Sequence, residues 1–477
     1  MELVHMRMYR LVDGKNLPIV ESHVIYSNSG SFQLTAVSTR TMINRTIGTM
    51  EGQKHSNIDT HTGEVQPTAT DVTLNPTSEA FLKEYKIRSS LERLIFHYAQ
   101  RPLSKFSIQG LIEQSESLSP NFILQNAQNT VEYLLAYNAR RLREFRRLPY
   151  LVVLNPSVAE SYNGYLNTMS SLITASLYPP ATLEENHAFA EKVLDEFINI
   201  HSDTLPSLSR GFNEVLHLVS TDRIKQFLDE HLRERISMRL IAHQHIQLSK
   251  ALKEGTYVKG GKYNGVIKEL DIYSVIKKNA EVVNDICLMK YDQAVEIRVD
   301  NNLYSNTYWS RAEPDLKASK KSDKVLFPYI EYHLDYMLTE LFKNSFRAHI
   351  ENKVHEPVNV TVSVSHSPLY LEVRIRDRGK GIPPAVLKHM FDYSFSTYES
   401  QEGEAYKTLN QPPGLGGNTV AGMGYGLPLS KNYIEIFNDT IPKDLDVEND
   451  AGRVKGSLTI QSYHGWGTDV YLKTVGS

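Results

Sequence analysis

The stretch "TELFKNSFRAHIE", residues 339–351, has the apolar spacing of an amphipathic helix, yet it carries a carboxylate, an ammonium, an amide and a guanidinium. At roughly 100° per residue, the apolar and small side chains form one stripe, made of Leu334, Met337, Leu338, Leu341, Ser345 and Ala348. Glu340, Asn344 and Arg347 fall together on the flank of that stripe. A carboxylate and an amide one turn apart can orient a metal ion or water; ordinary helix polarity is the alternative interpretation.

A second motif, "RIRDRGKGIPP" at residues 374–384, ends a predicted strand with Asp377. Gly379 and Gly381 follow, and residues without a Cβ let the backbone come close to a ligand. A carboxylate at the end of a buried strand can accept a hydrogen bond from an exocyclic amine, such as that of adenine. A glycine-containing turn after an edge strand is the other interpretation.

The third motif is the glycine-rich stretch "GLGGNTVAGMGYGLPLSKNY", residues 414–433, in which Gly422, Gly424 and Gly426 lead into a helix at about Leu427. Free N–H groups before a helix N-terminus favour phosphate, and glycine density makes a loop mobile, as a nucleotide lid should be. The stretch lacks the GxxxxGK[ST] pattern of a P-loop. A disordered surface loop is the alternative.

Size and composition limit the classes of protein to consider. A chain of 477 residues with 41% hydrophobic and 22% charged residues predicts two or three folded domains. The net charge of −3 gives no global field for nucleic acid or membrane. The single cysteine, Cys287, excludes an intramolecular disulfide and a multi-cysteine zinc site. The apolar runs are too short for a membrane span.

Three regions are expected along the chain. Residues 1–80 read as a disordered or targeting segment followed by a polar linker, since 22–50 carry no acidic residue and many Ser and Thr. Helical spacing over 79–100, 120–148, 182–218 and 222–252 predicts a helical bundle at 81–255, with a capping box at Thr182.

The third region, 265–477, is expected to be α+β. The segments "VNVTVSVSH" and "YLEVRIRD" alternate apolar and polar residues around a short turn, as in a hairpin, and "GSLTIQSYHGWGTDVYLKT" repeats the pattern. Helices are expected at 329–352 and 426–437. The arrangement predicts a largely antiparallel sheet with helices on one face.

In order, the motifs "ExxxN", "DxGxG", "GxGxG" and "GWGTDVYL" resemble the ATP-binding domain of histidine kinases, type II topoisomerases, Hsp90 chaperones and MutL repair proteins, an α/β sandwich. More narrowly, "HLDYMLTELFKNSFRA", "FDYSFST", "GMGYGLPLSKNY" and, in the helical region, "RRLPYLVVLNPSVAESY" resemble the mitochondrial kinases of pyruvate and branched-chain 2-oxoacid dehydrogenases. The similarity extends from about residue 80 to 475.

The resemblance implies a role for each matching residue. Glu340 would be the general base or orient the acceptor serine, and Asn344 would hold the Mg²⁺ that bridges the ATP phosphates. Lys343 and Arg347 would steady phosphate charge, and His245, which matches a motif of the helical domain on the substrate side, would be a second catalytic residue. The remaining positions implied to bind nucleotide are Asp377, Gly379, Gly381, Ser396, Thr397, Gly422, Gly424, Gly426, Leu427 and Thr468. Oxygens of Met390, Asp392 and Phe395 match a K⁺ site in branched-chain kinase relatives.

The implied enzyme is a serine protein kinase of the mitochondrial matrix that phosphorylates and inactivates the E1 α subunit of a 2-oxoacid dehydrogenase. It would dock on the lipoyl domain of the E2 core and form a homodimer, with no nucleic-acid partner. Tyr336 is closer to the branched-chain kinases, but the choice between pyruvate and branched-chain substrates stays open. The alternatives are a two-component histidine kinase, with His243 or His245 as acceptor, and a non-catalytic ATP-binding adaptor.

Overall fold

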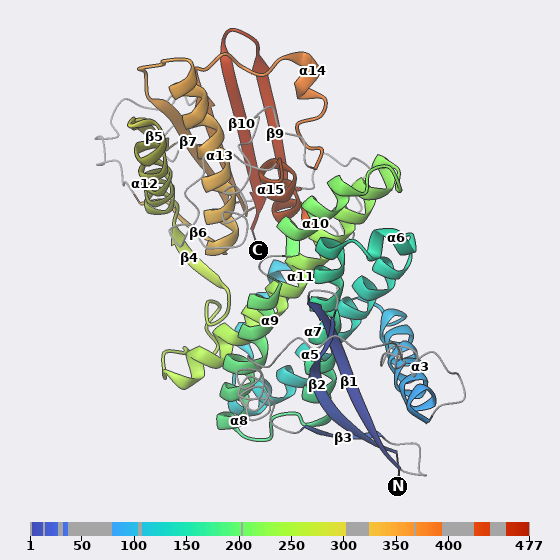
Figure 1. Ribbon diagram of the computed structural model, residues 1–477. Coiled ribbons are helices and arrows are strands. Elements are labelled where there is room, and N and C mark those ends of the chain that lie inside the picture. The colour runs from blue at the N-terminus through green and yellow to red at the C-terminus, as the bar shows by residue number, and fades with distance from the viewer. Residues whose placement is uncertain are drawn as a thin grey trace, which may run out of the picture.

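A computed structural model shows a helical region followed by a sheet-containing region (Figure 1). Apart from three N-terminal strands, the described chain begins at Glu79 and ends at Gly476. The structure describes residues 2–12, 15–26, 32–36, 79–103, 107–201, 204–301, 324–366, 369–393, 424–438 and 455–476. Within these ranges no helix is long and apolar enough to cross a membrane.

Four long helices dominate the helical region: α3 (Glu79–Ala99), α5 (Pro120–Arg146), α7 (Pro156–Leu177) and α11 (Thr221–Lys253). Helix α5 is central and packs against the other three. Shorter helices are α4 (Ile108–Glu116) and α6 (Tyr150–Val153). The predicted helices at 79–100, 120–148 and 222–252 are confirmed.

The predicted helix at 182–218 is wrong as a single element. The chain forms α8 (Leu183–Phe189), the π-helical turn η1 (Ala190–Leu194), α9 (Asp195–Ile200) and α10 (Thr204–Glu214). The capping box at Thr182 is confirmed, since Thr182 and Glu185 cap each other's backbone N–H groups. Helix α7 takes the fourth long position, although its many Ser, Asn and Gly residues obscure the apolar spacing of Val158, Tyr165 and Met169.

The first 36 residues contain an antiparallel sheet where the sequence indicates a disordered or targeting segment. Strand β1 (Glu2–Val12) pairs with β2 (Lys15–Tyr26), which pairs with β3 (Phe32–Ala36). The register pairs Val12 with Lys15, so two residues separate the strands. In the sequence Val12 is followed by an Asp-Gly dipeptide, which is typical of hairpins and is a local signal that composition alone does not register.

The second region is built on a five-stranded sheet, ordered β5-β7-β8-β10-β9, in which only the β5–β7 pair is parallel. The strands are β5 (Ile297–Asn301), β7 (Val358–His366), β8 (Leu369–Asp377), β9 (Ser457–Tyr463) and β10 (Gly467–Val475). Both predicted hairpins, β7–β8 and β9–β10, are confirmed.

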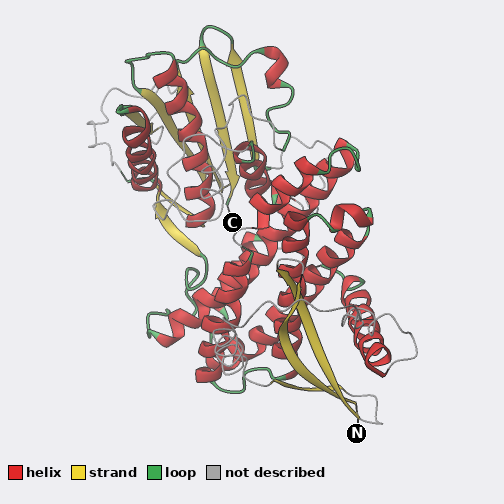
Figure 2. Cartoon of the chain, in the orientation of Figure 1, coloured by secondary structure: helices red, strands yellow, loops and turns green. Residues whose placement is uncertain are grey.

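Three helices cover one face of this sheet: α12 (Ile272–Tyr291), α13 (Glu331–Glu351) and α15 (Gly426–Glu435) (Figures 1 and 2). A two-stranded sheet of β4 (Ile267–Asp271) and β6 (Leu326–Ile330) precedes α12 and α13, and the short α14 (Pro384–Leu387) follows β8. The overall class is α+β, as predicted.

Helix α13 lies at the centre of this layer, between α12 and α15. The predicted apolar stripe is buried at Leu334, Met337, Leu338 and Leu341, whereas Ala348 is half-buried. In β8, Leu371, Val373, Ile375 and Asp377 are buried on the helix side. The alternation therefore ends with a carboxylate under the C-terminal end of α13.

A polar seam joins α11 to the sheet-containing region. Lys225, Asp229 and Arg233 lie one turn apart along α11. The Lys225 ammonium is 3.0 Å from the Asp392 carboxylate, and the Tyr393 hydroxyl donates a 2.8 Å hydrogen bond to Asp229. We call the contacts of these three α11 residues with the chain after α14 and with α15 the α11 seam.

Candidate active site

Glu340 and Lys343 form a buried ion pair at the middle of α13. The Lys343 Nζ lies 2.6 Å from Glu340 Oε1, and both side chains are almost fully buried. A spacing of three residues brings the two groups together on the helix surface. The base implied by the resemblance is thus already in contact with a cation.

The N-terminus of α15 abuts the same carboxylate. A Cβ placed on Gly426 would lie 2.3 Å from Glu340 Oε2, so only glycine fits without displacing Glu340. Gly424 has a φ of 77°, which favours glycine, and Tyr425, the residue before the helix, is buried and gives no side-chain cap. The first N–H groups of α15 are therefore positioned beside Glu340 with no side-chain cap from Tyr425.

Asn344 and Arg347 lie further along the same face of α13. Asn344 is exposed, so its amide is accessible to a ligand one turn from Glu340. Arg347 is half-buried and forms a 2.6 Å ion pair with Glu351. Within the described residues there is no cluster of three or more His, Cys, Asp or Glu that could hold a metal.

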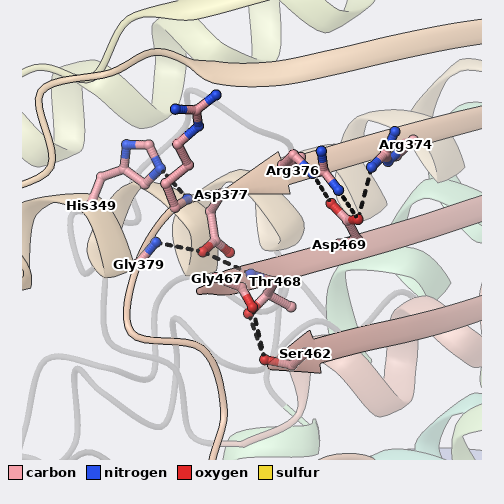
Figure 3. Close-up of polar contacts among 10 residues, drawn as sticks. His349, Arg374, Arg376, Asp377, Gly379, Ser462, Gly467, Thr468 and Asp469 are labelled. Atoms are coloured by element: carbon pink, nitrogen blue, oxygen red, sulfur yellow. Dashed lines mark hydrogen bonds and ion pairs between the residues drawn. The ribbon is translucent and has the colours of Figure 1, made fainter. Parts of the chain in front are cut away.

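Asp377 is held at the end of β8 by backbone donors (Figure 3). Its Oδ1 accepts hydrogen bonds from the N–H of Gly379 at 3.0 Å and from that of Thr468 at 3.2 Å. The cross-strand register pairs Thr468 with Asp377. Burial raises the pKa of Asp377 to about 6, although the two N–H groups oppose that shift. The structure brings Asp377, Gly379 and Thr468 together as predicted.

Glycine is required around Asp377 by the packing of backbone on backbone. Gly381 has a φ of 71°, and a Cβ there would lie 2.3 Å from the Tyr463 carbonyl oxygen. A Cβ on Gly379 would lie 2.9 Å from that of Ala348, and one on Gly467, at a φ of 115°, would lie 2.3 Å from the Asp377 carbonyl oxygen. The sequence analysis assigned Gly379 and Gly381 to ligand approach, but the packing of the fold itself already requires glycine there.

Some functional neighbours were not selected from the sequence. The Ser462 hydroxyl forms a 3.0 Å hydrogen bond with the Thr468 hydroxyl (Figure 3). It also accepts a 2.7 Å hydrogen bond from the Ile382 N–H, so it fixes the chain after Asp377. Ser462 is the cross-strand partner of Thr468 in the β9–β10 hairpin. The hairpin pattern in the sequence could therefore have predicted the pairing of Ser462 with Thr468, once a strand register had been assigned.

The positions implied for a K⁺ site are only partly described. Met390 is half-buried, and the Asp392 carboxylate is committed to Lys225 and to His389 Nδ1 at 2.8 Å. Burial would raise the pKa of Asp392, but these two partners lower it below its ordinary value. Leu427 is half-buried in the first turn of α15. The predicted residues outside the described ranges are Phe395, Ser396, Thr397 and Gly422.

His245 lies in the core of the helical region, away from this constellation. Its ring bonds to Asn126 of α5 at 3.0 Å and to Asn186 of α8 at 2.9 Å, and it is fully buried against Phe189. Burial lowers the pKa of His245 to about 3. All these contacts lie within the helical region, so the structure gives His245 a packing role and does not bring it to Glu340.

Comparisons with known proteins match both regions. Residues 105–268 match the family described as mitochondrial branched-chain alpha-ketoacid dehydrogenase kinase, and residues 330–474 match the histidine kinase-, DNA gyrase B- and HSP90-like ATPases. Mitochondrial pyruvate dehydrogenase (acetyl-transferring) kinase 1 of Saccharomyces cerevisiae is 32% identical over 400 residues, which cover 83% of this chain and 90% of the relative.

Mammalian relatives are more distant. Isozyme 1 of the mitochondrial pyruvate dehydrogenase kinase of Rattus norvegicus is 25% identical over 71% of this chain and 70% of its own length. Isozyme 4 of the same species is 27% identical over 71% and 74%. Since the family match and the identity to the yeast kinase span both regions, the chain belongs to the family of mitochondrial pyruvate and branched-chain 2-oxoacid dehydrogenase kinases, whose catalytic domain is a histidine kinase/Hsp90-like ATPase.

Proposed function

We propose that this protein is an ATP-dependent serine kinase that phosphorylates and inactivates the E1 α subunit of the pyruvate dehydrogenase complex. The observation that carries the proposal is the convergence on Glu340: a buried carboxylate on α13, with Asn344 one turn away and the α15 N-terminus against its other oxygen. Phosphoryl transfer needs mainly positioning and charge neutralisation, and these groups supply both.

In the proposed mechanism, Asp377 accepts a hydrogen bond from the adenine amine while Thr468 and Gly379 hold its carboxylate in place. The first N–H groups of α15 and the Lys343 ammonium bind phosphate oxygens. The acceptor serine oxygen attacks the γ-phosphorus, the bond from that phosphorus to the bridging oxygen breaks, and ADP leaves with the electron pair. Glu340 takes the serine proton.

Two ions belong to this proposal. The exposed amide of Asn344 suits Mg²⁺, which prefers few protein ligands together with phosphate oxygens and water, and Mg²⁺ would neutralise phosphate charge. Oxygens of Met390, Asp392 and Phe395 would hold K⁺, although the Asp392 carboxylate is already paired with Lys225.

We also propose a homodimer, formed through the face of the sheet opposite the described helices. Opposite the helices, Arg374 and Arg376 both contact Asp469, at 2.8 and 2.7 Å (Figure 3), and Lys473 lies over the Tyr370 ring. This face is polar and carries both signs of charge, as in a contact between two copies. We further propose docking of the helical region on the lipoyl domain of E2, and residence in the mitochondrial matrix.

The substrate choice rests on the relatives. The yeast and rat proteins described above are all named pyruvate dehydrogenase kinases, so pyruvate dehydrogenase is the proposed target in spite of the branched-chain name of the helical family. The histidine-kinase alternative loses support at His245, which is fully buried with both ring nitrogens engaged. The other candidate acceptor, His243, accepts a hydrogen bond from Arg239 Nε at 3.2 Å and packs against the Tyr332 ring.

The test is transfer from labelled ATP and magnesium to purified pyruvate and branched-chain E1 proteins in parallel, with and without the matching E2 core. Label on a serine of pyruvate E1, increased by its E2, is the expected result. Label on branched-chain E1 alone would reassign the substrate. ATP binding with no label on either E1 protein would favour the alternative that this protein is a non-catalytic ATP-binding adaptor.

The matched control is Glu340→Gln, which keeps the size of the side chain and removes its charge. We expect ATP binding to persist while transfer falls at least about a hundredfold. Retained transfer would show that Glu340 is not the base.

A further inference from the structure

The resting state of Glu340 is an unusual one for a catalytic base. Its Oε1 is 2.6 Å from the Lys343 ammonium, and its Oε2 lies where a Gly426 Cβ would be. A carboxylate in this position has a cation on one oxygen and the backbone of α15 against the other. It is therefore poorly placed to receive the proton of a serine hydroxyl.

Lys343 has two competing anionic partners in the proposed reaction. It is buried on α13 directly before Asn344, and its ion-pair partner Glu340 lies against the α15 N-terminus, where the phosphates are proposed to bind. An ATP triphosphate carries more charge than one carboxylate and presents several oxygens, so it can draw a flexible ammonium away from Glu340.

We propose that Lys343 is a positioning residue that exchanges its ion pair, from Glu340 in the free enzyme to the ATP phosphates in the complex, and thereby releases Glu340 as base only when nucleotide is bound. The inference deepens the proposed function, because it takes these two side chains as the phosphate and base groups of that reaction. The exchange sets the order of the reaction. Nucleotide binds first, because in the enzyme without ATP the Glu340 carboxylate is paired with Lys343 and cannot accept the serine proton.

The exchange makes a prediction about binding that needs no phosphoryl transfer. If Glu340 competes with phosphate for Lys343, then Glu340→Gln should bind ATP about five-fold more tightly or better, because Lys343 is available from the start. Adenosine has no phosphate, so its affinity should be unchanged. A purely structural ion pair predicts unchanged or weaker ATP binding in Glu340→Gln, because the site then loses order without gaining a cation.

The experiment is calorimetric titration of the full chain with ATP plus magnesium and, separately, with adenosine. Lys343→Met should bind ATP about tenfold more weakly, and the double variant should match Lys343→Met, since no ammonium remains to be released. Glu331→Gln, which removes a surface ion pair with Lys278 at the start of the same helix, is the matched control and should change nothing. Equal or weaker ATP affinity in Glu340→Gln would overturn the proposal.

A second measurement uses the protein without substitutions, so its result does not depend on whether a variant folds. A water-soluble carbodiimide joins a paired carboxylate and amine as an amide with loss of one water, which peptide mass analysis detects. We expect the Glu340–Lys343 amide in the free protein, and less of it with saturating magnesium and a non-hydrolysable ATP analogue. An unchanged yield, or none in the free protein, would contradict the exchange. Because these readouts are independent of transfer, they separate failure of the exchange from failure of the kinase assignment.

Discussion

At the residue scale, Asp377 combines two requirements that oppose each other. A pKa raised from its ordinary 3.8 to about 6 corresponds to about 3 kcal/mol in favour of the protonated form in the fold. Recognition of an amine, however, uses the carboxylate as an acceptor. The site therefore holds a charge that the fold disfavours above pH 6.

Asp377→Asn separates these requirements. The Asn Oδ1 can still accept from Gly379 and Thr468, but the buried charge is gone, so the free energy of unfolding at pH 8 should not decrease. ATP affinity should fall by about tenfold or more, because an acceptor for the adenine amine is lost. Calorimetric titration and urea denaturation measure the two effects.

The control for this change is Asp469→Asn on the opposite face of the sheet. Burial acts to raise the pKa of Asp469, but its two arginine partners lower it below its ordinary value, so removal of this charge should decrease the free energy of unfolding. ATP affinity should stay the same. If Asp377→Asn decreased the free energy of unfolding as much as Asp469→Asn does, the conclusion that the fold disfavours the charge of Asp377 would be contradicted.

Gly381→Ala tests the packing requirement. The positive φ and the 2.3 Å approach to the Tyr463 carbonyl oxygen should together decrease the free energy of unfolding by about 2 kcal/mol or more. Gly465→Ala is the matched control, because Gly465 has a φ of 91° with nothing within 4 Å of the added Cβ. Its cost should be smaller, about 1 kcal/mol from backbone strain alone. Equal costs in urea denaturation would show that the close approach does not matter.

At the element scale, α11 connects the helical region to the chain next to the nucleotide site. The Tyr393 hydroxyl accepts from Asn432 of α15 at 2.8 Å and donates to Asp229 of α11 at 2.8 Å, so one hydroxyl joins three elements. Arg233 extends the α11 seam to Glu435 at the end of α15. The position of α15, and with it the N–H groups beside Glu340, depends on this contact.

Tyr393→Phe should decrease the free energy of unfolding by about 1 kcal/mol, the usual contribution of one hydrogen bond. Combined with Asp229→Asn it should cost less than the sum of the two, because both changes remove the same contact. Tyr150→Phe, at a tyrosine that is 76% exposed, is the matched control and should leave stability unchanged. Strict additivity in a double-mutant cycle would mean that the contact does not form in solution.

Elements were predictable where their signal is local. Helix α13 and both hairpins follow from spacing within one segment, so the sequence places them correctly. The contacts of the α11 seam cannot be predicted in this way. Lys225 and Asp392 are 167 positions apart, and the residue pattern of neither segment predicts a contact with the other. The division of 182–218 into several short helices depends on how α8 and α10 pack, which spacing alone does not contain.

For the site, motif order identified the residues but not their contacts. Glu340, Asn344, Asp377 and Thr468 could be selected because each stands at a recognisable position in its motif. The close approach of Gly426 to Glu340 could not be predicted, because the two residues lie on different helices that are far apart in the sequence. His245 was misassigned because a motif match does not reveal burial.

At the scale of the whole molecule, buried histidines determine the response to acid. Among the described residues, burial lowers the pKa values of His201, His243 and His245 to about 3 and those of His231 and His333 well below 6.5. The unfolded chain binds protons on these rings from about pH 6.5 downward, while the folded chain does not. Stability is therefore lost as pH falls below 6.5.

The expected result is a steep decrease of the free energy of unfolding between pH 6.5 and 5. Asp377 works in the other direction, since the folded state takes up its proton first between about pH 6 and 4, but it is one group against these five histidines. Urea denaturation at a series of pH values measures the slope. A flat profile over this range would mean that the histidines are accessible to water in solution.

The glycines around Asp377 have a consequence for how this family diverges. Because Gly381 and Gly467 are needed by the backbone whether or not nucleotide binds, a descendant that lost its chemistry would still be selected to keep them for folding. Asn344 is different: it is exposed on α13, and drift would remove it soon after catalysis ceased to matter. In a relative whose activity has not been measured, the DxGxG pattern therefore indicates only that the fold is kept. An asparagine at the position of Asn344 is the better indication that the enzyme is active.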